Sequence, residues 1–278
     1  MQIRVVKSAG FCFGVKRAVD MAFRAASERK GRVCTFGPII HNPQVVDRLK
    51  KEGIGWVDSI EDDIDCLLIR THGIPKNLYE ELSRRNINLI DATCPFVKKA
   101  QEYAKLLKEE GYQIVILGDE NHPEVVGIKS YAGEDAVVVN SPEELPRLKR
   151  KVGVVVQTTQ PIEALQRLLS EIIKTTGELK VYNTICNSTA NRLKETEALA
   201  REVDVMLVLG GRNSANTKQL AKRCEQIGVK TYHIESAEEL KEEWFSEVNT
   251  VGITAGASTP DWIIEEVIKR LEILNTKH

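Results

Sequence analysis

The segment Ile87-Asn-Leu-Ile-Asp-Ala-Thr-Cys94-Pro95 carries the pattern that decides the fold. Residues 87–91 are short and rich in branched side chains, as a buried strand is. Pro95 suits the first turn of a helix because its missing N–H is not needed there. Apolar residues then follow at helical spacing, at Val97, Ala100, Ala104 and Leu107. The segment therefore predicts a strand, a cysteine at the end of the strand, and a helix.

The same pattern surrounds two other cysteines. Residues 3–7 form a strand-like run before Cys12, and residues 179–183 form one before Cys186. An apolar strand after each cysteine ends in a glycine, and these are Gly37, Gly118 and Gly210, which lie 25, 24 and 24 residues beyond the cysteines. Four positions past each glycine come His41, His122 and Ser214. The shared offsets predict three divergent copies of one unit.

Two further features recur at matching positions in the three copies. A serine with an acidic residue three positions on occurs in each copy, at Ser59, Ser141 and Ser236, and this pattern predicts a capping box at the start of a helix. The last strand of each copy ends in a polar loop, at residues 70–73, 157–159 and 256–258. Matching cysteines and matching loop ends favour a repeat over mere strand–helix alternation.

Strands that alternate with helices predict an α/β fold with mostly parallel sheets, whose functional groups gather at the carboxyl ends of the strands. We expect three α/β domains related by pseudo-threefold symmetry, at residues 13–94, 95–186 and 187–278. The last copy lacks a final strand, and we expect residues 1–12 to supply it. That arrangement closes the three domains into a trefoil and brings the three cysteines to one axis.

Composition excludes several classes of protein. The 278 residues include 39 basic and 40 acidic side chains, so the chain lacks the basic excess that a general nucleic-acid binder needs. No run approaches the length of a membrane span, and the first residues do not resemble a signal peptide. We therefore expect a cytoplasmic protein without nucleic-acid or membrane partners, with its six cysteines reduced.

Three converging thiolates suggest a metal centre at Cys12, Cys94 and Cys186. Structural zinc sites use four ligands, usually in close Cys-x-x-Cys pairs, and spacings of 82 and 92 residues fit a cluster held between domains better. Iron–sulfur clusters usually have four cysteine ligands, so three leave one iron open, which suits catalysis. The other cysteines are expected to be packing residues, and they are Cys34, Cys66 and Cys224.

Further candidate site residues lie where the predicted strands of the three copies end. His41, His72 and His122 each lie close to a proline at a strand end, and Glu124 follows in the first turn of a helix. A glutamate that faces a dry centre can hold a proton for substrate. Helix starts favour negative charge, and the loops at 210–217 and 252–259 lack a nucleotide-binding motif, so they favour a smaller phosphate ligand.

These residues resemble the family of 4-hydroxy-3-methylbut-2-enyl diphosphate reductases along the whole chain. The first motifs are Ala9-Gly-Phe-Cys-Phe-Gly-Val-Lys-Arg17, Gly37-Pro-Ile-Ile-His-Asn-Pro43, Arg70-Thr-His-Gly-Ile-Pro75 and Asp91-Ala-Thr-Cys-Pro95. The others are Asn121-His-Pro-Glu124, Gln157-Thr-Thr159, Asn183-Thr-Ile-Cys186, Asn213-Ser-Ala-Asn216 and Thr254-Ala-Gly-Ala-Ser-Thr-Pro260. The resemblance implies reductive removal of an allylic hydroxyl in the last step of the non-mevalonate isoprenoid pathway.

The resemblance also implies one 4Fe–4S cluster per chain, with Cys12, Cys94 and Cys186 as ligands and one iron open to the substrate. Glu124 is then the proton donor, with His122 and Thr158 beside the reacting group. The residues that hold the allylic diphosphate are then His41, His72, His122, Thr158, Ser214, Asn216 and Ser258. Electrons come from a reduced ferredoxin or flavodoxin, because no flavin or nicotinamide motif appears.

One position departs from the family pattern, which usually has a second serine where this chain has Ala215. Only the backbone of Ala215 is then available to the diphosphate. Two alternatives to the reductase stay open on the residues. One is an open-cluster hydro-lyase, which needs no external electrons, and the other is a sensor or structural protein that binds a cluster or zinc.

Overall fold

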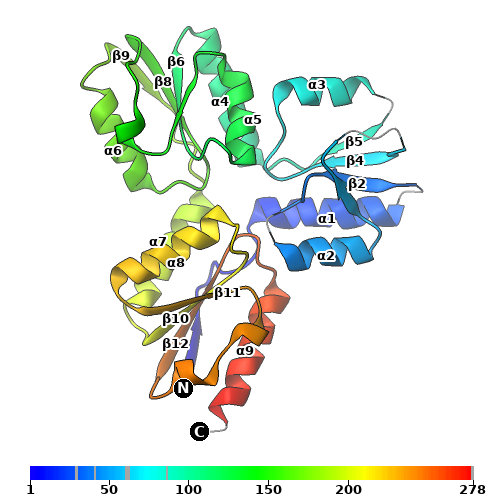
Figure 1. The fold of residues 1–278 in the computed structure, drawn as a ribbon, viewed down its shortest axis with the longest axis vertical. Coiled ribbons are helices and arrows are strands. Elements are labelled where there is room, and N and C mark those ends of the chain that lie inside the picture. The colour runs from blue at the N-terminus through cyan, green and yellow to red at the C-terminus, as the bar shows by residue number, and fades with distance from the viewer. Residues whose placement is uncertain (29–30, 41, 60–62, 86, 277–278) are drawn as a thin grey trace. The chain divides into compact units, whose positions relative to one another are not determined.

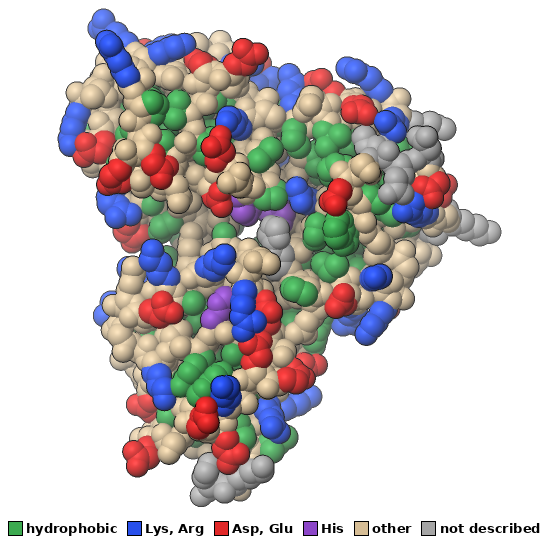
Figure 2. All heavy atoms as spheres, viewed as in Figure 1, with side chains coloured by type: hydrophobic (Ala, Val, Ile, Leu, Met, Phe, Trp, Pro, Cys, Tyr) green, Lys and Arg blue, Asp and Glu red, His purple; other side chains and the backbone are tan. Residues whose placement is uncertain are grey.

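The computed structural model describes residues 1–28, 31–40, 42–59, 63–85 and 87–276 (Figure 1). It forms two compact units. Unit 1 contains residues 1–16, 40–48 and 187–278, and unit 2 contains residues 17–39 and 49–186. None of the described helices has the length and apolar character that crossing a membrane requires. Figure 2 shows acidic and basic side chains mixed over the visible face, without a large region of one sign.

Unit 2 contains two four-stranded parallel sheets. The first has the order β3-β2-β4-β5, with β2 (Val33–Phe36), β3 (Gly55–Val57), β4 (Cys66–Ile69) and β5 (Asn88–Asp91). The second has the order β7-β6-β8-β9, with β6 (Gln113–Leu117), β7 (Val137–Val139), β8 (Lys151–Val156) and β9 (Glu178–Val181). The helices wholly inside this unit are α3 (Lys76–Arg84), α4 (Pro95–Glu109), α5 (Pro123–Ala132) and α6 (Ile162–Ile172).

Unit 1 contains the third four-stranded parallel sheet, of order β1-β12-β10-β11. Its strands are β1 (Gln2–Val5), β10 (Val205–Leu209), β11 (Lys230–Ile234) and β12 (Thr250–Ala255). Its helices are α7 (Asn187–Ala200), α8 (Ala215–Ile227) and α9 (Asp261–Asn275). Two more helices, α1 (Phe13–Glu28) and α2 (Pro43–Lys51), complete the described helices, and the predicted α/β class with parallel sheets is confirmed.

The central strands are mostly apolar, as expected for strands of parallel sheets that are covered on both faces. In β6, Ile114 and Ile116 pack with α4 and α5, while Val115 and Leu117 pack with α6 on the opposite face. All four side chains are fully buried. The carboxyl ends of these strands therefore remain as the places where polar side chains can gather.

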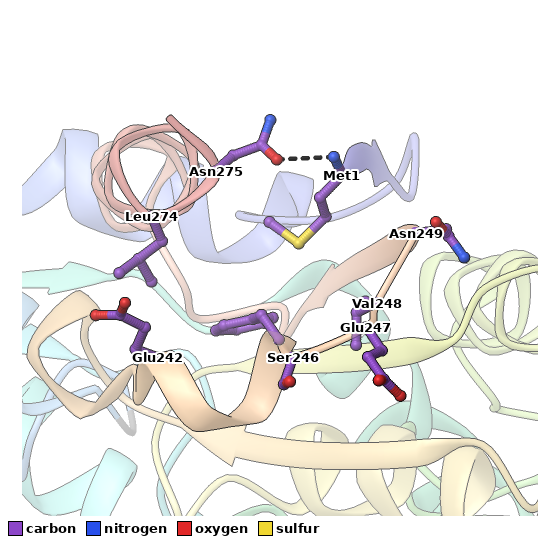
Figure 3. A pocket seen from close by; sticks show the side chains of 9 residues that line it. Met1, Glu242, Ser246, Glu247, Val248, Asn249, Leu274 and Asn275 are labelled. Carbon is purple, nitrogen blue, oxygen red and sulfur yellow. Dashed lines mark hydrogen bonds between the residues drawn. The ribbon is translucent and has the colours of Figure 1, made fainter. Parts of the chain in front are cut away.

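The N-terminal strand β1 pairs in parallel with β12, in a register that places Gln2 beside Thr250 and Val5 beside Ile253. The terminal amino group of Met1 donates a hydrogen bond of 2.7 Å to the side-chain oxygen of Asn275 (Figure 3). Unit 1 thus brings the N-terminal residue Met1 to the end of helix α9. The boundaries of the three predicted domains stay a prediction.

Strands β2, β6 and β10, one from each sheet, end in the same way. The amide of the glycine that follows each strand donates to the last residue of the neighbouring edge strand. These bonds run from Gly37 to Val57, from Gly118 to Val139 and from Gly210 to Ile234, at 2.8–3.0 Å. The three predicted glycine positions are therefore equivalent in the fold.

The predicted capping boxes are wrong in one respect. Ser141 and Ser236 each precede a single 3-10 turn rather than an α-helix, and neither hydroxyl caps it. The turns are η1 (Pro142–Glu144) and η2 (Ala237–Glu239), and a further turn is η3 (Glu242–Phe245). Each turn stops because the residue after it is extended. The box that begins at Ser59 extends outside the described residues.

Candidate functional site

Each of the three predicted ligand cysteines lies directly before a helix, at the end of a loop with the same hydrogen bond. The amide of Cys94 donates to the carbonyl of Thr71 (2.9 Å), and the amide of Cys186 donates to that of Thr158 (2.8 Å). In unit 1, the amide of Cys12 donates to Ala257 (3.2 Å). Each acceptor lies in the polar loop after a sheet strand. The three cysteines are therefore structurally equivalent.

The other three cysteines occupy different surroundings. Cys34 lies in β2, Cys66 in β4 and Cys224 in α8, and all three are fully buried. Burial raises the pKa of the Cys224 thiol to about 12, which disfavours the thiolate that binds metals. The predicted division between ligand and packing cysteines therefore agrees with their burial.

The chemistry of the equivalent cysteines fits an iron–sulfur cluster. All three are partly exposed thiols at helix N-termini, where the helix dipole favours an anionic group. Cys12 belongs to unit 1, and Cys94 and Cys186 belong to unit 2. Among the residues that the structure describes, no three His, Cys, Asp or Glu side chains are close enough to hold a metal ion. Convergence of the three thiols stays a prediction.

A buried carboxyl group lies beside the loop after β8, which contains Thr158. Glu124, in the first turn of α5, is only 2% exposed. Its carboxyl accepts a hydrogen bond of 2.6 Å from the amide of Thr158 and one of 3.0 Å from its hydroxyl. Burial raises the pKa of Glu124 to about 7, although both bonds from Thr158 act to lower it. Glu124 can therefore carry a proton near neutral pH.

Two histidines accompany this carboxyl in unit 2. His122 is the N-cap of α5, and its Nδ1 accepts a hydrogen bond of 3.2 Å from the amide of Glu124. The ring of His72 packs against that of His122, edge to face, with centroids 5.4 Å apart. The histidines therefore come from two sheets of one unit and meet beside Glu124. His41 lies outside the described residues.

Thr158 connects the acid to the cysteine. Its amide and hydroxyl bind Glu124, and its carbonyl accepts from the amide of Cys186. One residue therefore separates a protonatable carboxyl from a thiol that can bind metal. This short connection combines the two bonds from Thr158 to the Glu124 carboxyl with one backbone bond to Cys186.

The candidate diphosphate residues of unit 1 lie at helix starts and in the loop after β12. Ser214 is the N-cap of α8, and its hydroxyl accepts from the amide of Thr217 (3.4 Å). Ala215 is the first residue of that helix, where a backbone amide has no acceptor within the helix. Asn216 and Ser258 are buried, with exposures of 5% and 7%.

The side-chain nitrogen of Asn216 has no hydrogen-bond partner within the part of the chain that the structure describes. A buried amide that lacks a partner is costly, and native proteins usually satisfy it with water or ligand. Beside the positive end of the α8 dipole, such a donor suits an anion. This feature favours the predicted phosphate-binding role of Asn216.

One residue of this kind was missed from the sequence. The hydroxyl of Thr159 is buried and finds no partner among the described residues. Thr159 follows Thr158 as His72 follows Thr71 and Ser258 follows Ala257. Its place in the repeat register is therefore the signal that identifies it as a further polar residue of the site.

Three all-parallel sheets, each with a cysteine at a helix start, and a buried acid beside one of those cysteines define a repeat-built α/β protein with an enzyme-like site. Comparison with known proteins gives its family. The model of the family described as LytB protein matches residues 3–272, and the chain belongs to this family. The resemblance stated from the motifs is confirmed.

Relatives and solved structures agree along the full length. The chain is 52% identical over 280 residues to 4-hydroxy-3-methylbut-2-enyl diphosphate reductase of Geobacter sulfurreducens, covering all of this chain and 99% of the relative. It is 50% identical to the protein of the same name from Pelobacter propionicus, with both chains fully covered. A solved (E)-4-hydroxy-3-methyl-but-2-enyl diphosphate reductase shares 45% identity, with a TM-score of 0.76 over 98% of this chain and all of that one. The Plasmodium falciparum reductase structure shares 26%, with a TM-score of 0.89 over 98% and 87%.

Proposed function

We propose that this chain reduces (E)-4-hydroxy-3-methylbut-2-enyl diphosphate to isopentenyl diphosphate and dimethylallyl diphosphate, the terminal step of the non-mevalonate pathway. The carbon–oxygen bond of the allylic hydroxyl breaks, two electrons and two protons are consumed, and water leaves. The relatives that match over the full length carry this name, which supports the proposal. The activity requires a proton source, an anion site and an electron-transfer group.

The observation that carries the proposal is the path from Glu124 through Thr158 to Cys186. A carboxyl with a pKa of about 7 is protonated in half of the molecules at neutral pH, so it can give a proton and be recharged. Thr158 fixes both carboxyl oxygens, which orients the proton donor. The acid is therefore held one residue from a proposed cluster ligand, which supports its role as the proton donor.

Cys12, Cys94 and Cys186 are the proposed ligands of a 4Fe–4S cluster. When bound, such a cluster supplies the electrons and a Lewis-acidic iron that lacks a protein ligand. Its electrons come, in our proposal, from a reduced ferredoxin or flavodoxin. Thiolate ligands require a reducing compartment, so we propose a cytoplasmic location.

The diphosphate is proposed to bind at Ser214, Asn216 and Ser258, with the backbone amide of Ala215 in place of a second hydroxyl. The start of α8 supports this assignment because helix N-termini attract phosphate. His41, His72 and His122 are the proposed cationic or neutral donors on the remaining oxygens. Local donors of this kind bind a small anion even though the whole chain has a net charge of −1.

Anaerobic turnover tests the proposal directly. Protein reconstituted with iron and sulfide is mixed with the hydroxymethylbutenyl diphosphate and reduced methyl viologen, and the two diphosphate products are separated by chromatography. Oxidation of the dye together with both products supports the reductase. No product from protein with a full complement of cluster rejects it, and conversion without the dye indicates a hydro-lyase.

The pKa of Glu124 predicts the pH dependence of turnover. The donor must be protonated, and its protonated fraction falls above its pKa of about 7. We expect kcat to fall by about tenfold per pH unit above that value. Anaerobic rates at saturating substrate between pH 6 and 9 measure this falling limb of the plot of kcat against pH.

The variant Thr158→Val tests the origin of that limb. It removes the hydrogen bond from the Thr158 hydroxyl to the Glu124 carboxyl. That bond favours the carboxylate, so its loss should raise the pKa of Glu124. The falling limb should therefore move to higher pH in this variant. A limb at the same pH in both proteins means that another group titrates.

Asn216→Ala should weaken substrate binding. The buried amide loses a bond to a charged oxygen, so we expect KM to rise by about 10- to 100-fold. Asn213→Ala, in the exposed part of the same loop, is the matched control and should keep the KM of the wild type. Equal KM values for the two variants remove Asn216 from the diphosphate site.

A further inference from the structure

The loop that leads to Cys12 is held by a buried arginine. Arg192 of α7 is only 1% exposed. Its Nε donates to the carbonyl of Ser8 and its Nη2 to the carbonyl of Gly10, both at 2.8 Å. A buried guanidinium is costly unless its donors are satisfied. Two backbone acceptors from one loop therefore hold that loop in a single arrangement.

A carboxylate one turn along the same helix binds the other side of this loop. Oε2 of Glu195 accepts a hydrogen bond of 2.9 Å from the amide of Ser8. Gly10 adopts a left-handed conformation, with φ of 97°, and a side chain there would meet Asp261 at 2.8 Å. We call Arg192 and Glu195 together the clamp, because their side chains bind the backbone of Ser8 and Gly10 from two sides.

The clamp has counterparts in the other copies. Arg17 of α1 donates to the carbonyls of Thr93 and Asp91, at 3.3 and 3.5 Å, in the segment that ends at Cys94. Tyr103 of α4 stacks on Tyr182, with ring centroids 3.9 Å apart, in the segment that ends at Cys186.

The three contacts follow the same order along the chain. α1 begins after Cys12, α4 after Cys94 and α7 after Cys186. Each helix that starts after one cysteine thus holds the segment that ends at a different cysteine. The clamp on the Cys12 loop has two charge-assisted bonds of 2.8 Å, which are shorter than the 3.3 and 3.5 Å bonds of Arg17.

We infer that Arg192 and Glu195 are positioning residues for the Cys12 thiolate as a cluster ligand. The inference rests on the proposed function, because it assumes that Cys12 binds the cluster. Groups outside the ligands that fix a ligand in place are known to change metal affinity by about 10- to 100-fold. Loss of the clamp should therefore loosen the cluster without removing any ligand.

Glu195→Ala is the variant that tests the clamp most cleanly. The residue is partly exposed on a helix, where alanine is well tolerated. Glu197→Ala is the matched control, because Glu197 lies two residues along α7 and pairs with Arg223 of α8. Arg192→Lys keeps a charge but loses the two-pronged bond.

The readouts are iron and sulfide content, the rate of iron loss to a chelator under anaerobic conditions, and the EPR spectrum of the reduced cluster. We expect about tenfold faster iron loss from Glu195→Ala, faster loss still from Arg192→Lys, and a changed EPR spectrum in both. Glu197→Ala should match the wild type. Thermal unfolding of Glu195→Ala and Glu197→Ala should be alike, since both remove one partly exposed carboxylate.

Equal iron-loss rates and spectra for Glu195→Ala, Glu197→Ala and wild type overturn the inference while leaving the proposed function in place. If Arg192→Lys does not fold, Glu195→Ala alone decides the question. Wild-type protein that takes up no iron and sulfide overturns the proposed function, and the positioning role falls with it.

Discussion

Glu124→Gln is expected to abolish turnover while leaving the cluster in place. Glutamine keeps the size of the side chain and can still accept from Thr158, but it has no acidic proton to give. Removing a general acid typically costs about 10²- to 10⁴-fold in kcat. The loss should appear in kcat more than in KM, because we propose that the carboxyl acts on the reacting group and that the diphosphate binds to other residues.

The measurement is anaerobic turnover with reduced methyl viologen, paired with visible absorbance and iron content of the same sample. Glu120→Gln is the control, since Glu120 lies four residues earlier, is exposed and pairs with Lys129. That variant should keep wild-type activity. If Glu124→Gln retains activity within a few-fold of wild type, another group is the proton source.

Replacing any one of Cys12, Cys94 and Cys186 with alanine should remove activity and most of the cluster. Each variant would leave the proposed cluster with only two protein thiolates, one fewer than the three of the wild type and half of the usual four. Iron and sulfide analysis after anaerobic reconstitution measures the loss. The Mössbauer spectrum of the wild type should show one iron distinct from the other three.

Cys224→Ala is the control for the cysteine variants. Its thiol is fully buried in α8 and burial raises its pKa to about 12, so we expect it to serve as a packing residue and not as a ligand. The variant should bind a full cluster and show at most reduced thermal stability. A full, active cluster in Cys94→Ala, or loss of the cluster in Cys224→Ala, would contradict the assignment of ligands.

Much of the site was predictable because the chain repeats its own pattern. The division of six cysteines into ligands and packing residues followed from register, and burial of Cys34, Cys66 and Cys224 agrees with it. Position relative to the strand ends also predicted Glu124, His122 and Thr158 together. The structure adds what spacing does not contain, namely that Thr158 binds both the acid and the loop of Cys186.

Other features depend on contacts between distant segments. The serine and acid at Ser141 and Glu144 match a helix start, but Pro146 disfavours a helical Leu145, so only one turn forms. Nothing in the local sequence distinguishes Arg192, because its acceptors, Ser8 and Gly10, are over 180 residues away in the chain. Local patterns cannot identify such a partner.

The pairing of β1 with β12 has a consequence for how the protein is made. The ribosome emits Cys12 early, but the carbonyl of Ala257 that holds its amide comes some 245 residues later. At about 5 to 20 residues per second, Cys12 waits roughly 12 to 50 s for that carbonyl, whereas the sheets of unit 2 need nothing beyond residue 181. We therefore expect the proposed cluster to be loaded only after translation is complete.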